Sequence, residues 1–252
     1  MDAAHKRSRS SICGVLVVDK PVGMTSMDVV AIVRGRADGA RTGHAGTLDP
    51  LADGVLVLGL GRATKALGRF MDTTKVYRTE IDLSAFTNTD DLEGDRVEVE
   101  VAEPPDEARV RSVLATFRGR IMQRPPQRSA VKVGGRRAYA MARRGEAVEL
   151  EPRPVDVYEL ELVSYSWPLL EIAVTCGKGM YVRSLARDIG EALGTGGHCR
   201  RLRRTAVGPF TEDEAQVLDG LPRPLEQSHV IPLDDALARV DAFGPATYAD
   251  SG

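Results

Sequence analysis

The sequence predicts an α+β fold, in which a mixed, mostly antiparallel sheet is flanked by helices. Two observations lead to this prediction. Short apolar or β-branched runs alternate with amphipathic stretches of helical length, but without the regular strand-helix-strand rhythm of a parallel sheet. No segment repeats at the periods typical of solenoids. With 252 residues, of which 42% are hydrophobic, the chain is long enough to bury a substantial core.

The chain begins with a basic tail, residues 1–11, that is expected to be disordered. Strands are expected over the apolar or alternating runs Ile12–Asp19, Gly54–Leu60 and Val76–Leu83. Helices are expected over Ser26–Arg34 and Thr64–Met71, with Ser26 as the N-cap of the first. Arg41–Asp53 is rich in Gly, Pro and Asp and has no apolar period, so we expect a loop there.

The rest of the chain mixes both kinds of element. Strands are expected over Pro154–Ser164, Leu169–Cys176 and Arg200–Val207. Arg120–Ala130 contains two consecutive prolines and is expected to be irregular. Gly194 is expected to end a helix. The helices are predicted over Asp106–Phe117, Ala138–Arg144, Met180–Leu193 and Ile231–Val240.

Composition argues against several classes of protein. No apolar run approaches the ~20 residues that a membrane-spanning helix needs. No apolar signal-peptide core follows the basic start. The three cysteines, Cys13, Cys176 and Cys199, lack the spacing of a metal site. We therefore expect a cytoplasmic protein with reduced thiols and no bound zinc.

Charge is unevenly distributed along the chain. The net charge of −2 and the pI of about 6.1 do not by themselves suggest a nucleic-acid binder. However, residues 88–107 contain nine acidic residues and one basic residue, whereas residues 178–205 contain seven basic and two acidic residues. The basic segment is typical of a surface that attracts phosphate. Its arginines could also reflect the general abundance of arginine over lysine in this chain.

Asp49 lies in an unusual stretch, Gly43–Gly54. A carboxylate in a loop bounded by Gly and Pro, leading directly into a buried strand, is a common way of presenting a reactive group. An Asp-Pro pair also occurs in ordinary turns, where the aspartate caps its own backbone. The residues alone leave both interpretations open.

Five motifs, in order over about residues 12–210, resemble those of the TruB family of tRNA pseudouridine synthases. Gly43–Gly54 is similar to the catalytic motif of the family, with Asp49 in the place of its essential aspartate. Gly14–Ser26 resembles the first motif, including its Lys-Pro pair. The other three similar segments are Lys75-Val76-Tyr77, Cys176–Gly190 with a Tyr-x-Arg core at Tyr181 and Arg183, and Gly197–Val207 with its leucine at Leu202.

The resemblance implies the pseudouridine synthase fold and the isomerisation of uridine 55 in the T loop of tRNA. In this reaction the base is flipped out of the RNA, its N1–C1′ bond breaks, and it rejoins the sugar through C5. No metal or other cofactor is implied. Asp49 is then the catalytic carboxylate, Tyr77 stacks on the base, and Arg183 pairs with Asp49 to keep it ionised. We expect a monomer that acts without a guide RNA.

Further residues are expected to contact the RNA. The resemblance places Tyr181 along the pocket, Leu202 where it closes the pocket, and His44 in the space left by the flipped nucleotide. Phosphate contacts are assigned to the basic residues Lys20, Arg41, Arg200, Arg201, Arg203 and Arg204. A second basic segment, within about residues 120–150, could be a thumb that orders on RNA; its basic residues are Arg124, Arg128, Lys132, Arg136 and Arg137.

Two features depart from the family pattern. Asp53 stands where a small hydroxyl residue is usual and adds a negative charge near Asp49. Only 42 residues follow Phe210, so we expect a catalytic domain over residues 12–210 and a short extension over residues 211–252, with the PUA-like module of the family absent or incomplete. Three other interpretations remain: a tRNA-folding chaperone, a glycosidic hydrolase that uses Asp49 and Asp53, and a guide-RNA-dependent synthase.

Overall fold

The computed structural model describes residues 11–127, 132–133, 136–137 and 150–245. Within these ranges the chain forms two compact units. The first contains the residues up to Thr73 together with Arg204–Pro245, and the second contains Thr74–Arg203. The helix expected over Ala138–Arg144 and residues 1–10 of the expected tail lie outside the described residues. No helix in the described ranges is both long and apolar enough to cross a membrane.

The first unit is built on two long strands. β1 (Gly14–Lys20) pairs antiparallel with β3 (Ala52–Leu60), so that Lys20 lies opposite Gly54. Shorter strands extend this sheet: β2 (Thr42–His44) pairs with β3, while β14 (Gln216–Val217) and β15 (Ile231–Pro232) pair with β1. β13 (Phe210–Thr211) pairs with the end of β12 (His198–Val207). Much of the expected C-terminal extension is therefore part of this unit.

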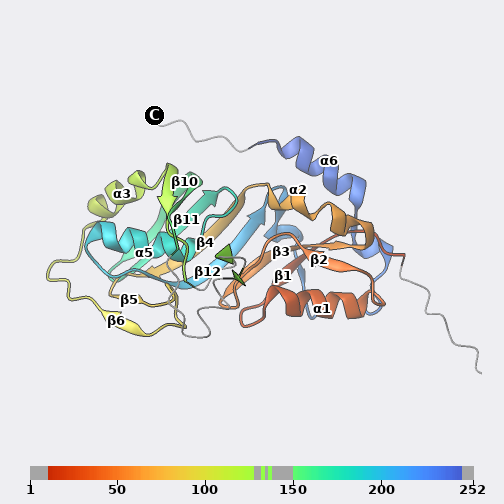
Figure 1. Ribbon diagram of the computed structural model, residues 1–252, viewed down its shortest axis with the longest axis horizontal. Helices are drawn as coiled ribbons and strands as arrows, with labels where there is room; N and C mark the ends of the chain where they lie inside the picture. Colours follow the sequence, from red (N-terminus) through yellow and green to blue (C-terminus); the bar gives the residue numbers. More distant parts are fainter. Residues whose placement is uncertain (1–10, 128–131, 134–135, 138–149, 246–252) are drawn as a thin grey trace, which may run out of the picture. The chain divides into compact units, whose positions relative to one another are not determined.

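Helices cover both faces of this sheet, because successive side chains of a strand point to opposite faces. On one face, Leu16 and Val18 share a core cluster with Val29 and Val33 of α1 (Ser26–Arg36). On the other face, Val15 and Val17 share a cluster with residues of α2 (Leu67–Met71) and α6 (Leu233–Phe243). Figure 1 shows α1 on the opposite side of β1 and β3 from α2 and α6.

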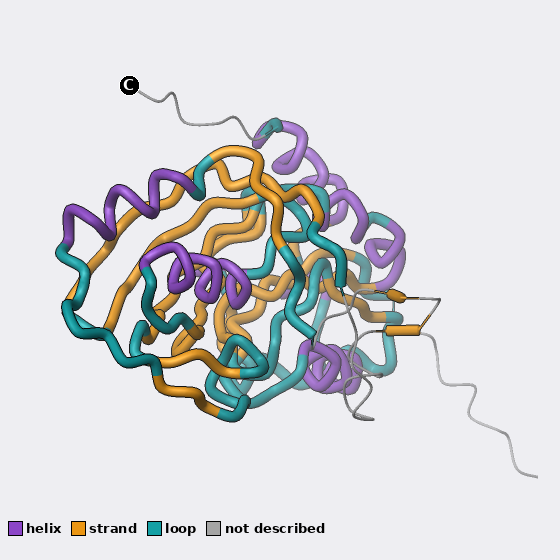
Figure 2. The backbone as a smooth tube through the Cα atoms, turned by 60° about the vertical axis from the view of Figure 1, so that its left-hand side comes forward, coloured by secondary structure: helices purple, strands orange, loops and turns teal. Residues whose placement is uncertain are grey.

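The second unit is an antiparallel sheet with helices packed on it. β4 (Lys75–Asp82), β11 (Leu169–Cys176), β10 (Arg153–Ser166) and β7 (Gly119–Gln123) pair in that order, each antiparallel to the next. Helices α3 (Glu107–Thr116) and α5 (Val182–Leu193) contact each other and lie against these strands (Figures 1 and 2). Two small hairpins join β5 (Ala85–Thr87) to β6 (Arg96–Glu98) and β8 (Lys132–Val133) to β9 (Arg136–Arg137). The predicted α+β class is confirmed.

Most of the expected elements occur within a few residues of their predicted bounds, with some corrections. Arg120–Ala130 is not irregular throughout, because Gly119–Gln123 pairs with β10 before the two prolines are reached. The expected loop Arg41–Asp53 contains β2, and the helix expected over Thr64–Met71 is divided between a 3-10 turn (Gly61–Lys65) and α2. Gly194 ends α5 in the left-handed conformation, as predicted, with a φ of 75°. Two further 3-10 turns span Glu212–Glu214 and Gln227–His229.

The start of α1 also differs from the prediction. Thr25, not Ser26, is its N-cap: the Thr25 hydroxyl accepts a hydrogen bond from the Asp28 N–H (3.1 Å), and the Asp28 carboxylate accepts one from the Thr25 N–H (2.9 Å). This arrangement leaves the buried Ser26 hydroxyl available for another partner.

Candidate active site

Asp49 lies in the segment between β2 and β3, residues 45–51, which we call the Asp49 loop. The Asp49 side chain is partly exposed, but the main chain beside it is tightly held. The Ser26 hydroxyl donates to the Leu48 carbonyl (3.0 Å) and accepts from the Leu48 N–H (2.8 Å). On the other side, the Pro50 carbonyl accepts a hydrogen bond from the Gly23 N–H (2.7 Å). The backbone around Asp49 is thus fixed to the start of α1 and to the turn before it.

Arg204 holds the same loop from the end of β12. Its side chain is buried, with only 1% of the residue exposed. The guanidinium donates to the backbone carbonyls of Val55 (2.8 Å), Gly46 (3.3 Å) and Thr47 (3.4 Å). A buried charge needs such partners, since an unsolvated guanidinium is very costly. Arg204 therefore connects the backbone before Asp49 to the strand that follows it.

Gly54 allows this close approach. Its φ of 99° lies in the region that favours glycine, and a Cβ there would lie only 2.2 Å from the Arg204 carbonyl oxygen. Any larger residue at position 54 would push β3 away from Arg204.

Lys20 places a second buried cation near the loop. Its ammonium donates to the carbonyls of Pro21 (2.9 Å) and Met24 (2.8 Å). Burial lowers the pKa of Lys20 to about 8, although the negative charges of Asp53 and Asp49 act in the opposite direction. Lys20 and Arg204 are both buried and donate to carbonyls within the protein, and their predicted contacts with RNA phosphates stay a prediction.

His44 ends β2, just before the Asp49 loop, and is partly buried. Burial lowers the pKa of His44, and the positive charge of Arg204 lowers it further. A neutral imidazole at neutral pH follows from this environment.

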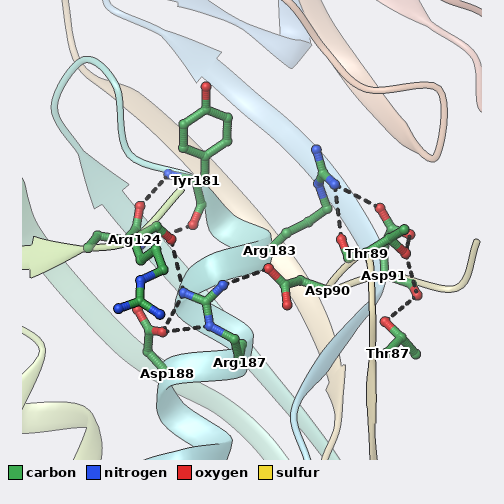
Figure 3. A network of polar contacts seen from close by, with 10 residues as sticks. Thr87, Thr89, Asp90, Asp91, Arg124, Tyr181, Arg183, Arg187 and Asp188 are labelled. Atoms are coloured by element: carbon green, nitrogen blue, oxygen red, sulfur yellow. Dashed lines mark hydrogen bonds and ion pairs between the residues drawn. The ribbon is translucent and has the colours of Figure 1, made fainter. Parts of the chain in front are cut away.

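Arg183 lies in the first turn of α5, in the second unit. Its guanidinium donates to the carboxylate of Asp91 (3.0 Å) and to the carbonyl of Thr89 (3.1 Å), as Figure 3 shows. Both charged side chains are almost fully buried, at 4% exposed for Arg183 and 3% for Asp91. Such a pair keeps the guanidinium in one orientation. Asp49 and Arg183 lie in different units, and their predicted pairing stays a prediction.

Two tyrosines expected at the site are also in the second unit, and both are partly exposed. Tyr77 is in β4, opposite Val174 of β11. Tyr181 is the N-cap residue of α5, and its N–H and carbonyl form hydrogen bonds of 2.8 and 3.1 Å with the Gln123 side chain. The guanidinium carbon of Arg153 lies 5.2 Å from the centre of the Tyr181 ring, a cation–π contact.

The residues of β12 alternate in exposure. Leu202 is buried, with 7% of the residue exposed, and so is Arg204, whereas Arg201 is exposed and Arg203 is partly exposed. Arg200 is partly exposed and forms an ion pair with Glu80 at 3.5 Å. The phosphate contacts of Arg200, Arg201 and Arg203 stay a prediction.

The structure groups the predicted site residues into two sets. The first set lies in or around the Asp49 loop of the first unit and comprises Asp49, His44, Lys20 and Arg204. The second set belongs to the second unit and comprises Tyr77, Tyr181, Arg183 and Leu202. Sequence reasoning missed the Ser26–Leu48 contact and the role of Asp91. In the sequence, Asp91 is distinguished only as one member of the acidic segment over residues 88–107. Within the described ranges, no group of three or more His, Cys, Asp or Glu side chains is arranged to hold a metal ion.

Two family models match the chain. The model for the TruB family pseudouridylate synthase N-terminal domain covers residues 34–182, and that for the tRNA pseudouridylate synthase B C-terminal domain covers residues 183–238. A tRNA pseudouridine synthase B of Thermobifida fusca is 49% identical over 233 residues, which are 89% of this chain and 78% of that protein. One from Cereibacter sphaeroides is 49% identical over 246 residues, 96% of this chain and 81% of that protein.

Solved structures are also similar. A chain of a Cbf5-Nop10-Gar1 complex is 30% identical, with a TM-score of 0.70, over 90% of this chain and 62% of that one. A chain of an H/ACA RNP bound to a substrate RNA containing 2'-deoxyuridine is 28% identical, with a TM-score of 0.66, over 90% of this chain and 61% of that one. This chain therefore spans less than two thirds of the length of those two chains.

Proposed function

Since the chain belongs to the TruB family of pseudouridylate synthases, we propose that it converts uridine 55 in the T loop of tRNA to pseudouridine. Asp49 is the catalytic residue of this proposal. The curated relatives carry the name tRNA pseudouridine synthase B, which supports tRNA as the substrate.

The observation that carries the proposal is the contrast between the Asp49 side chain and its backbone. The carboxylate is partly exposed, while hydrogen bonds from Ser26, Gly23 and Arg204 hold the main chain on both sides of it. An ordinary Asp-Pro turn needs no buried arginine to support it. A rigidly placed, accessible carboxylate is what a reaction at the sugar or base of a bound nucleotide requires.

In the second unit, the proposal assigns the remaining roles to Tyr77, Tyr181 and Arg183. Taking uridine out of a folded RNA costs a few kcal/mol of stacking, and aromatic faces return roughly 1–3 kcal/mol per stacked base. Two partly exposed tyrosine rings fit this requirement. Arg183, held by Asp91, supplies a cation in a fixed direction. Leu202 closes the pocket, and His44 takes the place of the flipped base.

Recognition of the RNA relies on phosphate contacts from the basic side chains that are not buried. Among the residues predicted to contact phosphate, these are Arg200, Arg201 and Arg203, together with the exposed Arg41. We also propose that the protein acts as a monomer in the cytoplasm and needs neither a guide RNA nor a cofactor.

The test is a reaction of the purified chain alone with an unmodified tRNA transcript, followed by mapping of pseudouridine along the RNA. We expect one pseudouridine, at position 55, and none in a transcript with cytidine at that position. Pseudouridine at another position of the tRNA would contradict the proposed specificity for uridine 55.

The similarity to a chain of an H/ACA RNP favours a second candidate, a guide-RNA-dependent synthase. Under that alternative the purified chain is inactive until a guide RNA is added. A tRNA-folding chaperone would leave uridine unchanged while still binding tRNA. A glycosidic hydrolase would release free base and would lose activity when Asp53 is replaced by alanine.

A further inference from the structure

Arg187 connects three segments of the second unit. It lies on α5, one helical turn after Arg183. Its guanidinium donates to the Asp90 carboxylate (2.8 Å), to the Asp188 carboxylate (2.7 Å) and to the backbone carbonyl of Arg124 (2.9 Å), as Figure 3 shows. Asp90 and Arg124 are far apart in the sequence, so Arg187 ties the loop before β6 and the end of β7 to the same helix.

The Asp90 contact is directly coupled to the Arg183–Asp91 pair. Residues four apart on a helix lie on the same face, and here Arg183 and Arg187 bind the two consecutive carboxylates of Asp91 and Asp90. In an extended chain, consecutive side chains point to opposite sides. Asp90 departs from that pattern, because its φ of 60° lies in the left-handed region, which is rare for residues other than glycine.

The Arg124 contact extends the connection to the polypeptide that follows β7. The neighbouring Gln123 already binds both the N–H and the carbonyl of Tyr181, at the start of α5. Arg187 adds a second attachment at the next residue, one and a half helical turns further along α5. The end of β7 is thereby attached to α5 at two successive residues, Gln123 and Arg124.

We propose that Arg187 is a positioning residue for the reaction. By binding Asp90 and the Arg124 carbonyl together, it fixes the backbone that presents Asp91 to Arg183. The inference rests on the proposed function, in which Arg183 acts at the flipped uridine. Arg187 itself has no contact with the substrate in this role; it determines where Arg183 is held.

The charges around Asp90 give this role a pH signature. Burial raises the pKa of Asp90 to about 6; Arg187 and Arg183 oppose this rise, while Asp188 and Asp91 add to it. At neutral pH Asp90 is ionised and binds Arg187. As the pH falls through about 6, Asp90 takes up a proton and this ion pair weakens.

The experiment measures single-turnover rate constants on a tRNA transcript from pH 5.5 to 8, together with tRNA affinity and thermal unfolding. Arg187→Gln should lower the rate about tenfold at pH 7.5, while the tRNA Kd changes less than about twofold. Arg187→Lys keeps the positive charge but lacks the forked guanidinium that reaches both the Asp90 carboxylate and the Arg124 carbonyl. We therefore expect its rate to lie between those of the wild type and Arg187→Gln. The matched control is Arg111→Gln, which breaks an exposed pair with Glu107 one turn away on α3 and should leave the rate unchanged.

Asp90→Asn tests the same contact from the other side, because it removes the negative charge of Asp90 with almost no change in side-chain shape. We expect it to lower the rate at pH 7.5 and to abolish the fall in rate that the wild-type protein shows below pH 6. Because both residues act through one contact, the double variant should be no slower than the slower single variant.

The inference is overturned if Arg187→Gln reacts at the wild-type rate, or if Asp90→Asn keeps the acid fall. Rates that drop only in proportion to the folded fraction also overturn it, since a purely structural role predicts that result. If Arg187→Gln does not fold, the pH profile of Asp90→Asn decides. A wild-type protein that makes no pseudouridine contradicts the proposed function instead, whatever the variants do.

Discussion

The Asp49 loop and the loop that carries Asp91 are each held by a buried arginine, but the arginines bind different partners. Arg204 donates to three backbone carbonyls around the Asp49 loop. Arg183 and Arg187 bind the carboxylates of Asp91 and Asp90 in addition to one carbonyl each. Carbonyls do not titrate, whereas carboxylates do. The contacts of Arg204 should therefore persist over a wide pH range, whereas the ion pair between Asp90 and Arg187 should weaken as Asp90 is protonated.

The largest expected effect is that of removing the carbonyl-bound arginine. Arg204→Met leaves the carbonyls of Val55, Gly46 and Thr47 without their donor, and a buried acceptor that loses its partner costs about 1–3 kcal/mol. We expect the free energy of unfolding, measured in urea, to fall by about 3 kcal/mol or more. In a His44→Gln background, which removes the imidazole whose pKa Arg204 lowers, the loss should be nearly the same at pH 6 and pH 7.5. A strongly pH-dependent loss would contradict the difference between the two loops.

Asp90→Asn should give the next largest effect, and this one depends on pH. Because the pKa of Asp90 is higher in the folded protein than in the unfolded chain, the folded state binds the proton more tightly, and wild-type stability falls as the pH rises from about 4 to 6. Asparagine lacks this dependence. The free energy of unfolding of Asp90→Asn, taken relative to that of the wild type, should therefore rise by roughly 2 kcal/mol from pH 4.5 to pH 7 in urea titrations. A constant difference between the two proteins would show that Asp90 does not titrate in this range.

A smaller effect is expected at Ser26. Its hydroxyl makes two hydrogen bonds with the backbone of Leu48, so Ser26→Ala should lower the free energy of unfolding by about 1–3 kcal/mol. The neighbouring variant Thr25→Ala removes the N-cap of α1 and should cost about 1 kcal/mol. Of these two variants, only Ser26→Ala should also lower the rate of pseudouridine formation, because of the two residues it is Ser26 that binds the Asp49 loop. Equal rates for the two variants would show that the hydrogen bonds between Ser26 and Leu48 do not affect catalysis.

Much of the fold was predictable because continuous apolar runs or period-two alternation mark the long strands directly. The five sequence motifs also led to the prediction that Asp49 is catalytic and to its expected partners, which stays a prediction. The contacts that hold these residues were not predictable in the same way, because they join distant parts of the chain. Arg204, for example, binds a carbonyl 149 residues away, and Ser26 binds one 22 residues away.

Two of the missed roles nevertheless left a signal in the sequence. If Arg200–Val207 is a strand, Arg204 must share the face of Leu202, which favours burial over phosphate binding. Arg187 follows Arg183 by one helical turn, so a common role on one face of the helix could have been inferred. The left-handed conformation of Asp90 left a weaker signal, because aspartate adopts it more often than most residues do but at only a small share of positions.

The central claim is that the Asp49 carboxylate carries out the isomerisation, and an Asp49→Asn variant tests it most directly. The variant should bind a tRNA transcript as well as the wild-type protein does and should form pseudouridine at least about a thousandfold more slowly. Asp53→Asn, in the same region but outside the loop, should remain active. Pseudouridine at position 55, formed by Asp49→Asn at a rate near that of the wild type, would contradict the account.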